Sequence, residues 1–225
     1  MSIMKNMPIA DMRTITTVEA VKAIEEMHNI AVLILPEDGD PEVLNAIHAI
    51  PKKNVATVLT LPKDAKVNQM NGQVELTPAV LKQEGILLVN GQAIVTGICD
   101  EVKATVIANG QLIYPKACAI NLNNCNGQAM SFDYETYVNF NDDMTIDADT
   151  MELMEYKTFF LCNGDIRFAK DVTLDMMKEK LPCFLFNGDI VCDKKIAAYL
   201  KLHSSINGDL KIRGAQSEDN EDDDE

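Results

Sequence analysis

The segment Phe184-Leu185-Phe186-Asn187-Gly188-Asp189-Ile190-Val191-Cys192 places an Asn-Gly pair between two short apolar runs. The pair recurs along the chain, and seven of the 11 glycines follow an asparagine. An apolar residue precedes each Asn, and Gln or Asp follows each Gly. The copies are Asn71-Gly72, Asn90-Gly91, Asn109-Gly110, Asn126-Gly127, Asn163-Gly164, Asn187-Gly188 and Asn207-Gly208. This self-similarity predicts a repeat architecture in which these residues are structural.

The spacing of the copies is regular enough to suggest stacked turns of chain. Successive asparagines are 19, 19, 17, 37, 24 and 20 residues apart. The step of 37 residues is close to two average steps, and Asn141-Asp142-Asp143 lies inside it as a candidate degenerate copy. A period of this length is typical of solenoids, in which each turn contacts only its neighbours.

Two local structures compete for the Asn-Gly segment. A two-residue hairpin would put Phe186 opposite Asp189 on one face of a sheet, an apolar residue against a charged one. A single bent, extended strand instead gives each copy one apolar face, because alternate side chains share a face. In two copies that face comprises Phe184, Phe186, Gly188, Ile190 and Cys192, and Phe160, Cys162, Gly164, Ile166 and Phe168. The bent strand is therefore favoured over the hairpin.

These observations predict a right-handed, parallel β-helix-like β-solenoid over residues 66–213, with turns of about 19 residues that bend at Asn-Gly. Helical insertions are expected after Thr77-Pro78, after Thr173 and over Lys194–Leu202. Because several turns carry such helices, an α/β solenoid of the leucine-rich-repeat kind is the alternative.

The first 65 residues lack the Asn-Gly mark. A capping box at Thr16 and Glu19 predicts an amphipathic helix that continues through Ile24 and Met27. The elements expected next are a strand over Ile30–Leu35, a helix opened by Asp40-Pro41 and a strand over Val55–Leu61. We expect residues 1–65 to form two helix–strand units that cap one end of the solenoid.

Composition narrows the function classes. The chain has 225 residues, 47% of them hydrophobic, and a net charge of −15. The segment Ser217–Glu225 holds seven acids and no base, so residues 214–225 are expected to be a disordered acidic tail. Binding to nucleic acid or to anionic lipid by charge is not expected of such a chain. The longest apolar run has six residues and no secretory signal is evident, which predicts a cytoplasmic protein without membrane spans.

The cysteines show no Cys-x-x-Cys pair, and mostly apolar residues surround them. They are Cys99, Cys118, Cys125, Cys162, Cys183 and Cys192. Buried free thiols are favoured over disulfides, because a chain of this size does not need covalent cross-links. Cys99 and Cys118 are 19 residues apart and could lie on consecutive turns, but a metal ion would need two further ligands.

No motif assigns a catalytic, cofactor-binding or metal residue, and no cofactor is expected. His203 precedes Ser204, yet adjacency in sequence is not catalytic geometry, and the chain has no Gly-x-Ser-x-Gly elbow. His28 and His48 fall near the ends of expected helices. The acidic stretch 141–149 lacks the glycine and spaced glutamate of an EF-hand loop, which favours a solvated arc over a Ca²⁺ site.

Short turns with Gly188-Asp189 or Gly91-Gln92 bends, together with a charged tail, resemble the bactofilin family of polymer-forming β-solenoids over about residues 65–213. The resemblance lies in repeat style and implies self-association. We expect a non-catalytic scaffold or protein-interaction solenoid whose partner is another protein or a second copy. A glycan- or peptide-binding module along the Asn, Gln and Asp ladder is one alternative. An enzyme with its site in a solenoid groove is the other, so whether the chain is an enzyme stays open.

Overall fold

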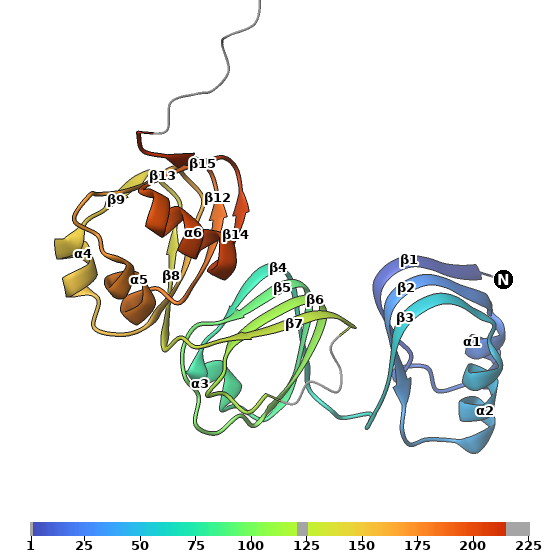
Figure 1. The fold of residues 1–225 in the computed structure, drawn as a ribbon. Coiled ribbons are helices and arrows are strands. Elements are labelled where there is room, and N and C mark those ends of the chain that lie inside the picture. Colours follow the sequence, from blue (N-terminus) through green and yellow to red (C-terminus); the bar gives the residue numbers. More distant parts are fainter. Residues whose placement is uncertain (1, 121–125, 215–225) are drawn as a thin grey trace, which may run out of the picture. The chain divides into compact units, whose positions relative to one another are not determined.

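The computed structural model describes residues 2–120 and 126–214. The described chain is built mainly of parallel β-sheets with short helices on the connections (Figure 1). It divides into two compact units, which are described separately. The first comprises Met1–Ile94, Cys99–Ile113 and Ala119–Met130, and the second Val95–Ile98, Tyr114–Cys118 and Ser131–Glu225.

The first sheet of the first unit has the order β1-β2-β3 and is parallel throughout. Its elements are β1 (Ser2–Asp11), α1 (Val18–Lys22), β2 (Ile24–Pro36), α2 (Pro41–Ala49) and β3 (Lys52–Leu61). The two helices lie next to each other across the concave side of the curved strands (Figure 1). The core between this sheet and its helices includes Met27, Ile30 and Leu33 of β2 and Val43 and Ile47 of α2.

The first helix is shorter than the sequence suggests. It begins after the Thr17 N-cap and ends at Lys22, so the prediction that it continues through Ile24 and Met27 is wrong. Both residues belong to β2, which also starts earlier than predicted. Asn29 has φ +53° and is skipped in the pairing of β1 with β2, so Met27 and Ile30 are both buried. A bent strand thus imitates the three-residue spacing of a helix.

The second sheet of this unit has the order β4-β5-β6-β7. Its elements are β4 (Val67–Leu76), α3 (Pro78–Leu81), β5 (Gly85–Val95), β6 (Ala104–Pro115) and β7 (Asn126–Phe132). β5 runs without interruption through Asn90-Gly91, and it pairs in parallel with β6, Asn90 opposite Asn109. The predicted domain boundary after residue 65 falls in the connection between β3 and β4.

The second unit contains two parallel sheets, β14-β12-β10-β8 and β15-β13-β11-β9. Each layer consists of one strand from each sheet, joined at an Asn-Gly-Asp bend or, between β8 and β9, at Asn141-Asp142-Asp143. The elements are β8 (Thr136–Phe140), β9 (Met144–Ile146), α4 (Ala148–Leu153), β10 (Thr158–Cys162), β11 (Ile166–Phe168), α5 (Leu174–Lys180), β12 (Cys183–Asn187), β13 (Ile190–Cys192), α6 (Lys194–His203), β14 (Ser204–Asn207) and β15 (Leu210–Ile212).

The pairing decides between the two structures proposed for the Asn-Gly segment. β12 ends at Asn187 and β13 begins at Ile190, yet the two strands belong to different sheets, and each pairs in parallel with the next layer. The bent strand is therefore confirmed and the hairpin excluded at this copy. The inner face is confirmed as well, because its apolar members are buried between the two sheets: Phe160, Cys162, Ile166, Phe168, Phe184, Phe186, Ile190 and Cys192.

Helix ends follow the sequence signals where a cap residue is present. Thr77, Thr173 and Asp40 accept hydrogen bonds from the first turns of α3, α5 and α2, as their positions predict. α4 was not expected from the sequence. The expected acidic tail begins at residue 214, and from residue 215 it lies outside the described residues.

Candidate functional site

Asparagine amides form a continuous ladder across the second sheet of the first unit. Asn90 Nδ2 donates to Asn71 Oδ1 at 3.3 Å, and Asn109 Nδ2 donates to Asn90 Oδ1 at 3.2 Å. Asn126 Nδ2 then donates to Asn109 Oδ1 at 2.8 Å. Each amide donates to the preceding layer and accepts from the following one. The ladder therefore satisfies side chains that the bend turns outward.

The second unit repeats this arrangement and includes the degenerate copy. Asn163 Nδ2 donates to Asn141 Oδ1, and Asn187 Nδ2 donates to Asn163 Oδ1, both at 2.7 Å. Asn141-Asp142-Asp143 is therefore the first layer of this stack. Asn207 lies opposite Asn187 in the parallel pairing, and its carbonyl oxygen accepts from Gly188 N at 3.1 Å.

An aspartate column accompanies the second ladder. The backbone N–H of Asp165 donates to Asp143 Oδ1 at 2.8 Å, and that of Asp189 donates to Asp165 Oδ1 at 2.9 Å. The N–H of Asp209 donates to Asp189 Oδ1 at 2.9 Å. Each carboxylate thus holds the backbone of the next layer. Lys211 Nζ lies 2.7 Å from Asp189 Oδ2, and this hydrogen bond, followed by that from Asp209, lowers the pKa of the Asp189 carboxyl.

The glycines are required because successive layers come close at the bend. A Cβ added to Gly110 would lie 2.2 Å from the carbonyl oxygen of Gly91, and one added to Gly208 would lie 2.2 Å from that of Gly188. Gly72 has no atom within 4 Å of such a Cβ, because it belongs to the first layer of its stack. Asp142 occupies the corresponding first position of the second stack. A side chain is therefore accepted only where no earlier layer lies beneath it.

A third asparagine ladder lies in residues 1–65, where no Asn-Gly pair predicts it. Asn29 Nδ2 donates to Asn6 Oδ1 at 2.9 Å, and Asn54 Nδ2 donates to Asn29 Oδ1 at 2.7 Å. All three asparagines have φ between +51° and +55°. Here Asn itself takes the left-handed conformation, which it tolerates better than other residues with side chains, and no glycine follows. The signal was present as Asn-Met, Asn-Ile and Asn-Val at steps of 23 and 25 residues.

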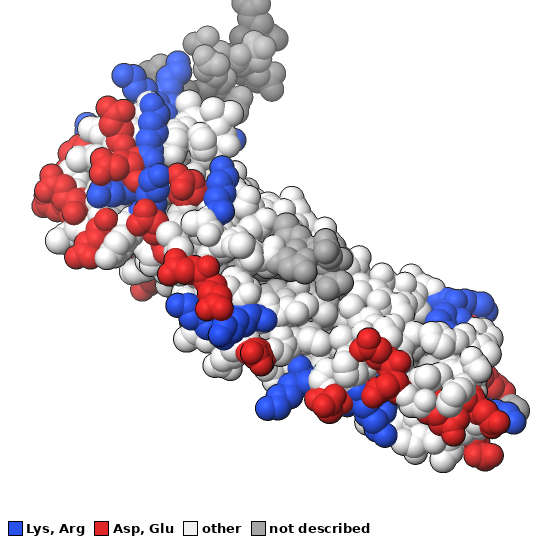
Figure 2. Space-filling model, turned by 90° about the horizontal axis from the view of Figure 1, so that it is seen from below, with Lys and Arg blue, Asp and Glu red and all other residues white. Residues whose placement is uncertain are grey.

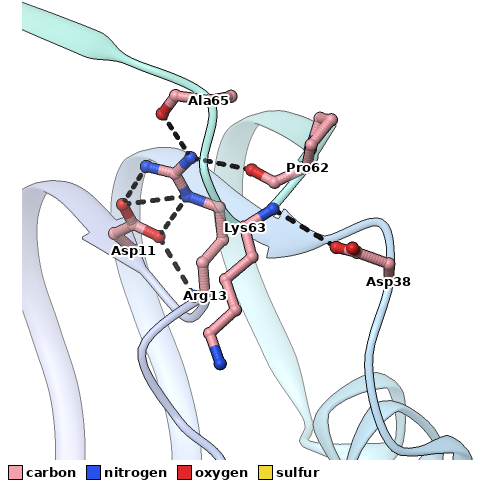
Figure 3. Close-up of polar contacts among 6 residues, drawn as sticks. All are labelled: Asp11, Arg13, Asp38, Pro62, Lys63 and Ala65. Carbon is pink, nitrogen blue, oxygen red and sulfur yellow. Dashed lines mark hydrogen bonds and ion pairs between the residues drawn. The ribbon is translucent and has the colours of Figure 1, made fainter.

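A partly buried arginine, Arg13, ties the end of β1 to the connection after β3 (Figure 3). Arg13 Nη2 and Nε donate to the Asp11 carboxylate at 2.8 and 3.0 Å. Arg13 Nη1 donates to the carbonyl oxygens of Pro62 at 3.0 Å and Ala65 at 2.8 Å. The adjacent cavity is only about 210 Å³. The guanidinium donors are thus used within the protein, which indicates a structural role.

The histidines are distributed over three elements and both units. His28 lies on β2, His48 on α2 and His203 at the end of α6. The His203 ring stacks on Tyr199 with centroids 4.4 Å apart, while Ser204 Oγ donates to the Leu200 carbonyl oxygen. Ser204 and His203 thus lie at the end of α6, where their side chains contact Leu200 and Tyr199.

The acidic stretch 141–149 is used for local structure. Asp143 belongs to the aspartate column, and Asp147 Oδ1 accepts from the backbone N of Thr150 at 2.8 Å as the N-cap of α4. The hydrogen bonds from Thr150 lower the pKa of the Asp147 carboxyl. No group of three or more His, Cys, Asp or Glu side chains within residues 2–120 and 126–214 is arranged to hold a metal ion.

The thiols of Cys162, Cys183 and Cys192 are free and buried, as predicted. Burial raises the pKa of Cys183 to about 12 and that of Cys192 to about 11. Cys99 and Cys118 are also buried, and their Sγ atoms donate to the carbonyl oxygens of Glu101 and Gly97. Cys125 lies outside the described residues.

The second unit carries a groove of about 660 Å³ between α5, α6 and the β7–β8 connection. Its apolar surface comes from Phe132, Leu174, Pro182 and Leu202, and Leu202 is 81% exposed. Lys116, Lys178 and Lys195 also line it. Sequence reasoning missed this groove because its residues come from separate segments and share no local pattern.

On the face seen in Figure 2, Lys and Arg lie in small groups among Asp and Glu, separated by wide uncharged areas. Among the described residues, no helix combines the length and apolarity that a membrane span requires. Comparisons of the chain with protein-family models, with curated proteins and with solved structures find no match.

Proposed function

We propose that this chain is a right-handed β-solenoid that serves as a non-catalytic scaffold for protein binding. The observation that carries the proposal is the layered pairing of the second unit, in which side-chain ladders reinforce every backbone ladder. Stacks of this kind are stabilised by neighbouring layers and present open strand edges only at their ends.

The last described layer, β14 with β15, is the proposed binding edge. Asp209 O accepts from Ile190 N, and Arg213 N donates to Cys192 O, so alternate residues of β15 pair inward. By the same alternation, the backbone groups of Leu210 and Ile212 face away from β13. An extended segment of a partner could add to this edge through main-chain hydrogen bonds.

The bend restricts which segment can add. The carbonyl oxygen of Gly188 lies 2.2 Å from a Cβ added to Gly208 in the next layer. The carbonyl oxygen of Gly208 has the same position relative to a strand that adds to the last layer. A partner strand therefore needs glycine opposite Gly208. Asp142 of a second copy has a Cβ at that position, so its β8–β9 layer fits poorly, whereas Asn71-Gly72 meets the requirement. Self-association, which the resemblance to bactofilins implies, would therefore use the Asn71-Gly72 segment of the second copy rather than its β8–β9 layer.

Hydrogen–deuterium exchange of the full chain at low and high protein concentration tests the proposal. Self-association through the edge predicts increased protection of peptides covering 204–212 and of peptides covering β4 of the second copy, which contains Asn71-Gly72. Deleting Ser217–Glu225 removes the seven negative charges that follow this edge in the sequence, and it should strengthen self-association, as should high salt in the full chain. Protection at β1 alone, or a truncated chain that stays monomeric while the full chain dimerises, would contradict the proposed edge.

A further inference from the structure

The groove of the second unit combines an apolar floor with three lysines that line it. Its volume of about 660 Å³ lies within the range of sites that hold small molecules. Phe132, Leu174 and Pro182 are partly buried there, and Leu202 stays 81% exposed although it lies on a well-packed helix. A large apolar side chain left this exposed beside other apolar groups marks a surface suited to an apolar ligand.

Three lysines lie around this apolar surface. Lys116 precedes β7, Lys178 is on α5 and Lys195 is on α6, and all three line the groove. None of the ion pairs found in the described part of the chain involves them. They gather on a chain whose net charge is −15, so the local charge opposes that of the whole protein.

The acidic residues near the groove do not form ion pairs with these lysines in the described residues. Asp175 and Glu179 of α5 do not line the groove, and Glu179 Oε1 lies 3.2 Å from Lys180 Nζ. Asp133, the acidic residue that lines the groove, is already bound to Lys157, with Nζ and Oδ2 2.6 Å apart. The Tyr199 hydroxyl donates to the Leu181 carbonyl oxygen at 3.2 Å, which directs it into the core rather than toward the groove. α6 contributes no acidic residue, since its sequence is Lys-Lys-Ile-Ala-Ala-Tyr-Leu-Lys-Leu-His.

We propose that this groove binds a small anionic amphiphile, a molecule with a carboxylate head and an unbranched apolar chain. The head would lie between the ammonium groups of Lys178 and Lys195, and the chain would lie against Leu202, Leu174 and Phe132. A charge-assisted hydrogen bond to an ammonium group is about twice as strong as a neutral one. Burial of the chain supplies the remaining affinity. This binding goes beyond the scaffold role and does not depend on it.

Calorimetric titration of the full chain with sodium dodecanoate, kept below its micelle concentration, tests the proposal. The wild type should bind one molecule of dodecanoate. The double variant Lys178→Gln/Lys195→Gln should have a Kd at least about tenfold higher. Lys201→Gln removes a lysine of the same helix that does not line the groove, so its Kd should equal that of the wild type. Leu202→Ser should also weaken binding. Because Leu202 is exposed, this change should leave the fold intact, so the loss of binding can be assigned to the groove.

Two further probes separate the head from the chain. Dodecyltrimethylammonium has the same chain with a positive head, and acetate has the carboxylate without the chain. Both should bind at least about tenfold more weakly than dodecanoate. The proposal is overturned if dodecanoate does not bind, if the double lysine variant binds it as well as the wild type, or if the cationic probe binds equally. Thermal unfolding of each variant establishes that a lost signal is not lost folding.

Discussion

The carbonyl oxygen of Gly164 lies 2.3 Å from the point where an alanine at position 188 would place its Cβ. The contact is with backbone, which cannot move aside without disturbing the pairing of β10 with β12. Gly188 does not have a positive φ, so the contact alone excludes a side chain there. The glycine at position 188 is thus dictated by the layer before it.

Gly188→Ala should lower the free energy of unfolding by about 3 kcal/mol or more, at the upper end of the cost of overpacking. Gly72→Ala is the matched control, because its φ of +83° is strained for alanine but no atom lies within 4 Å of the new Cβ. The free energy of unfolding of that variant should fall by only about 1 kcal/mol. Urea unfolding of both variants measures the difference, and equal losses would show that layer contact does not set the glycine requirement.

The asparagine ladder and the left-handed backbone can be separated at Asn29. Asn29→Gly keeps the φ of +53° accessible but removes the hydrogen bonds to Asn6 and from Asn54, for a loss of about 1 kcal/mol. Asn29→Ala removes the same bonds and adds backbone strain of about 1 kcal/mol. Denaturant unfolding should therefore rank wild type, glycine and alanine in decreasing stability. An alanine variant as stable as the glycine variant would refute the role of the left-handed conformation.

How far the sequence predicts this fold depends on whether a signal is local. The inner face at Asn163 and Asn187 follows from alternation along single strands, and the capped helices follow from Thr77, Asp40 and Thr173. All of these were predicted correctly. The layers at Asn6, Asn29 and Asn54 were not, because the search required a glycine that this sheet does not need. In the groove, Lys116, Lys178 and Lys195 are brought together only by tertiary structure, so no local pattern could reveal them.

Arg13 should be a strong point of stability in the first unit, since its side chain is 10% exposed and binds Asp11, Pro62 and Ala65. Arg13→Met removes the guanidinium donors to Asp11, Pro62 and Ala65, although the backbone N–H of residue 13 still donates to Asp11, and it should cost about 2–3 kcal/mol. Lys63→Met is the control, because it removes one positive charge nearby while Asp38 still accepts from the Lys63 backbone N–H (Figure 3). Thermal and denaturant unfolding compare the two variants. Similar losses of stability would show that the effect comes from removing a positive charge rather than from the hydrogen bonds of Arg13.

The buried thiols should react slowly with alkylating agents. At pH 8, Cys183 and Cys192, with pKa values of about 12 and about 11, hold far less thiolate than an ordinary cysteine. Alkylation by iodoacetamide, followed residue by residue by peptide mass spectrometry, should be at least about a hundredfold slower in the native protein than in denaturant. Rapid native labelling at these two positions would show that the second unit opens readily.

Acid should weaken the aspartate column through Asp189. The hydrogen bond from Lys211 and that from the Asp209 backbone favour the charged carboxylate, so its pKa is lower in the folded than in the unfolded chain. The stabilisation from this shift is therefore complete above the unfolded pKa, near pH 4, and is lost as the pH falls through the folded pKa.

Asp189→Asn isolates this charge, because the asparagine Oδ1 can still accept from the Asp209 N–H. At pH 7 the variant should be less stable than the wild type. This gap, the difference between their free energies of unfolding, should narrow as the pH is lowered from 5 toward 3. Asp175→Asn, on the exposed first turn of α5, removes an equal charge from outside the column and serves as the control. Urea unfolding across this pH range measures both gaps. If the Asp189 gap is unchanged at pH 3, or if the control shows the same narrowing, the carboxylate of Asp189 does not hold the layers together through its charge.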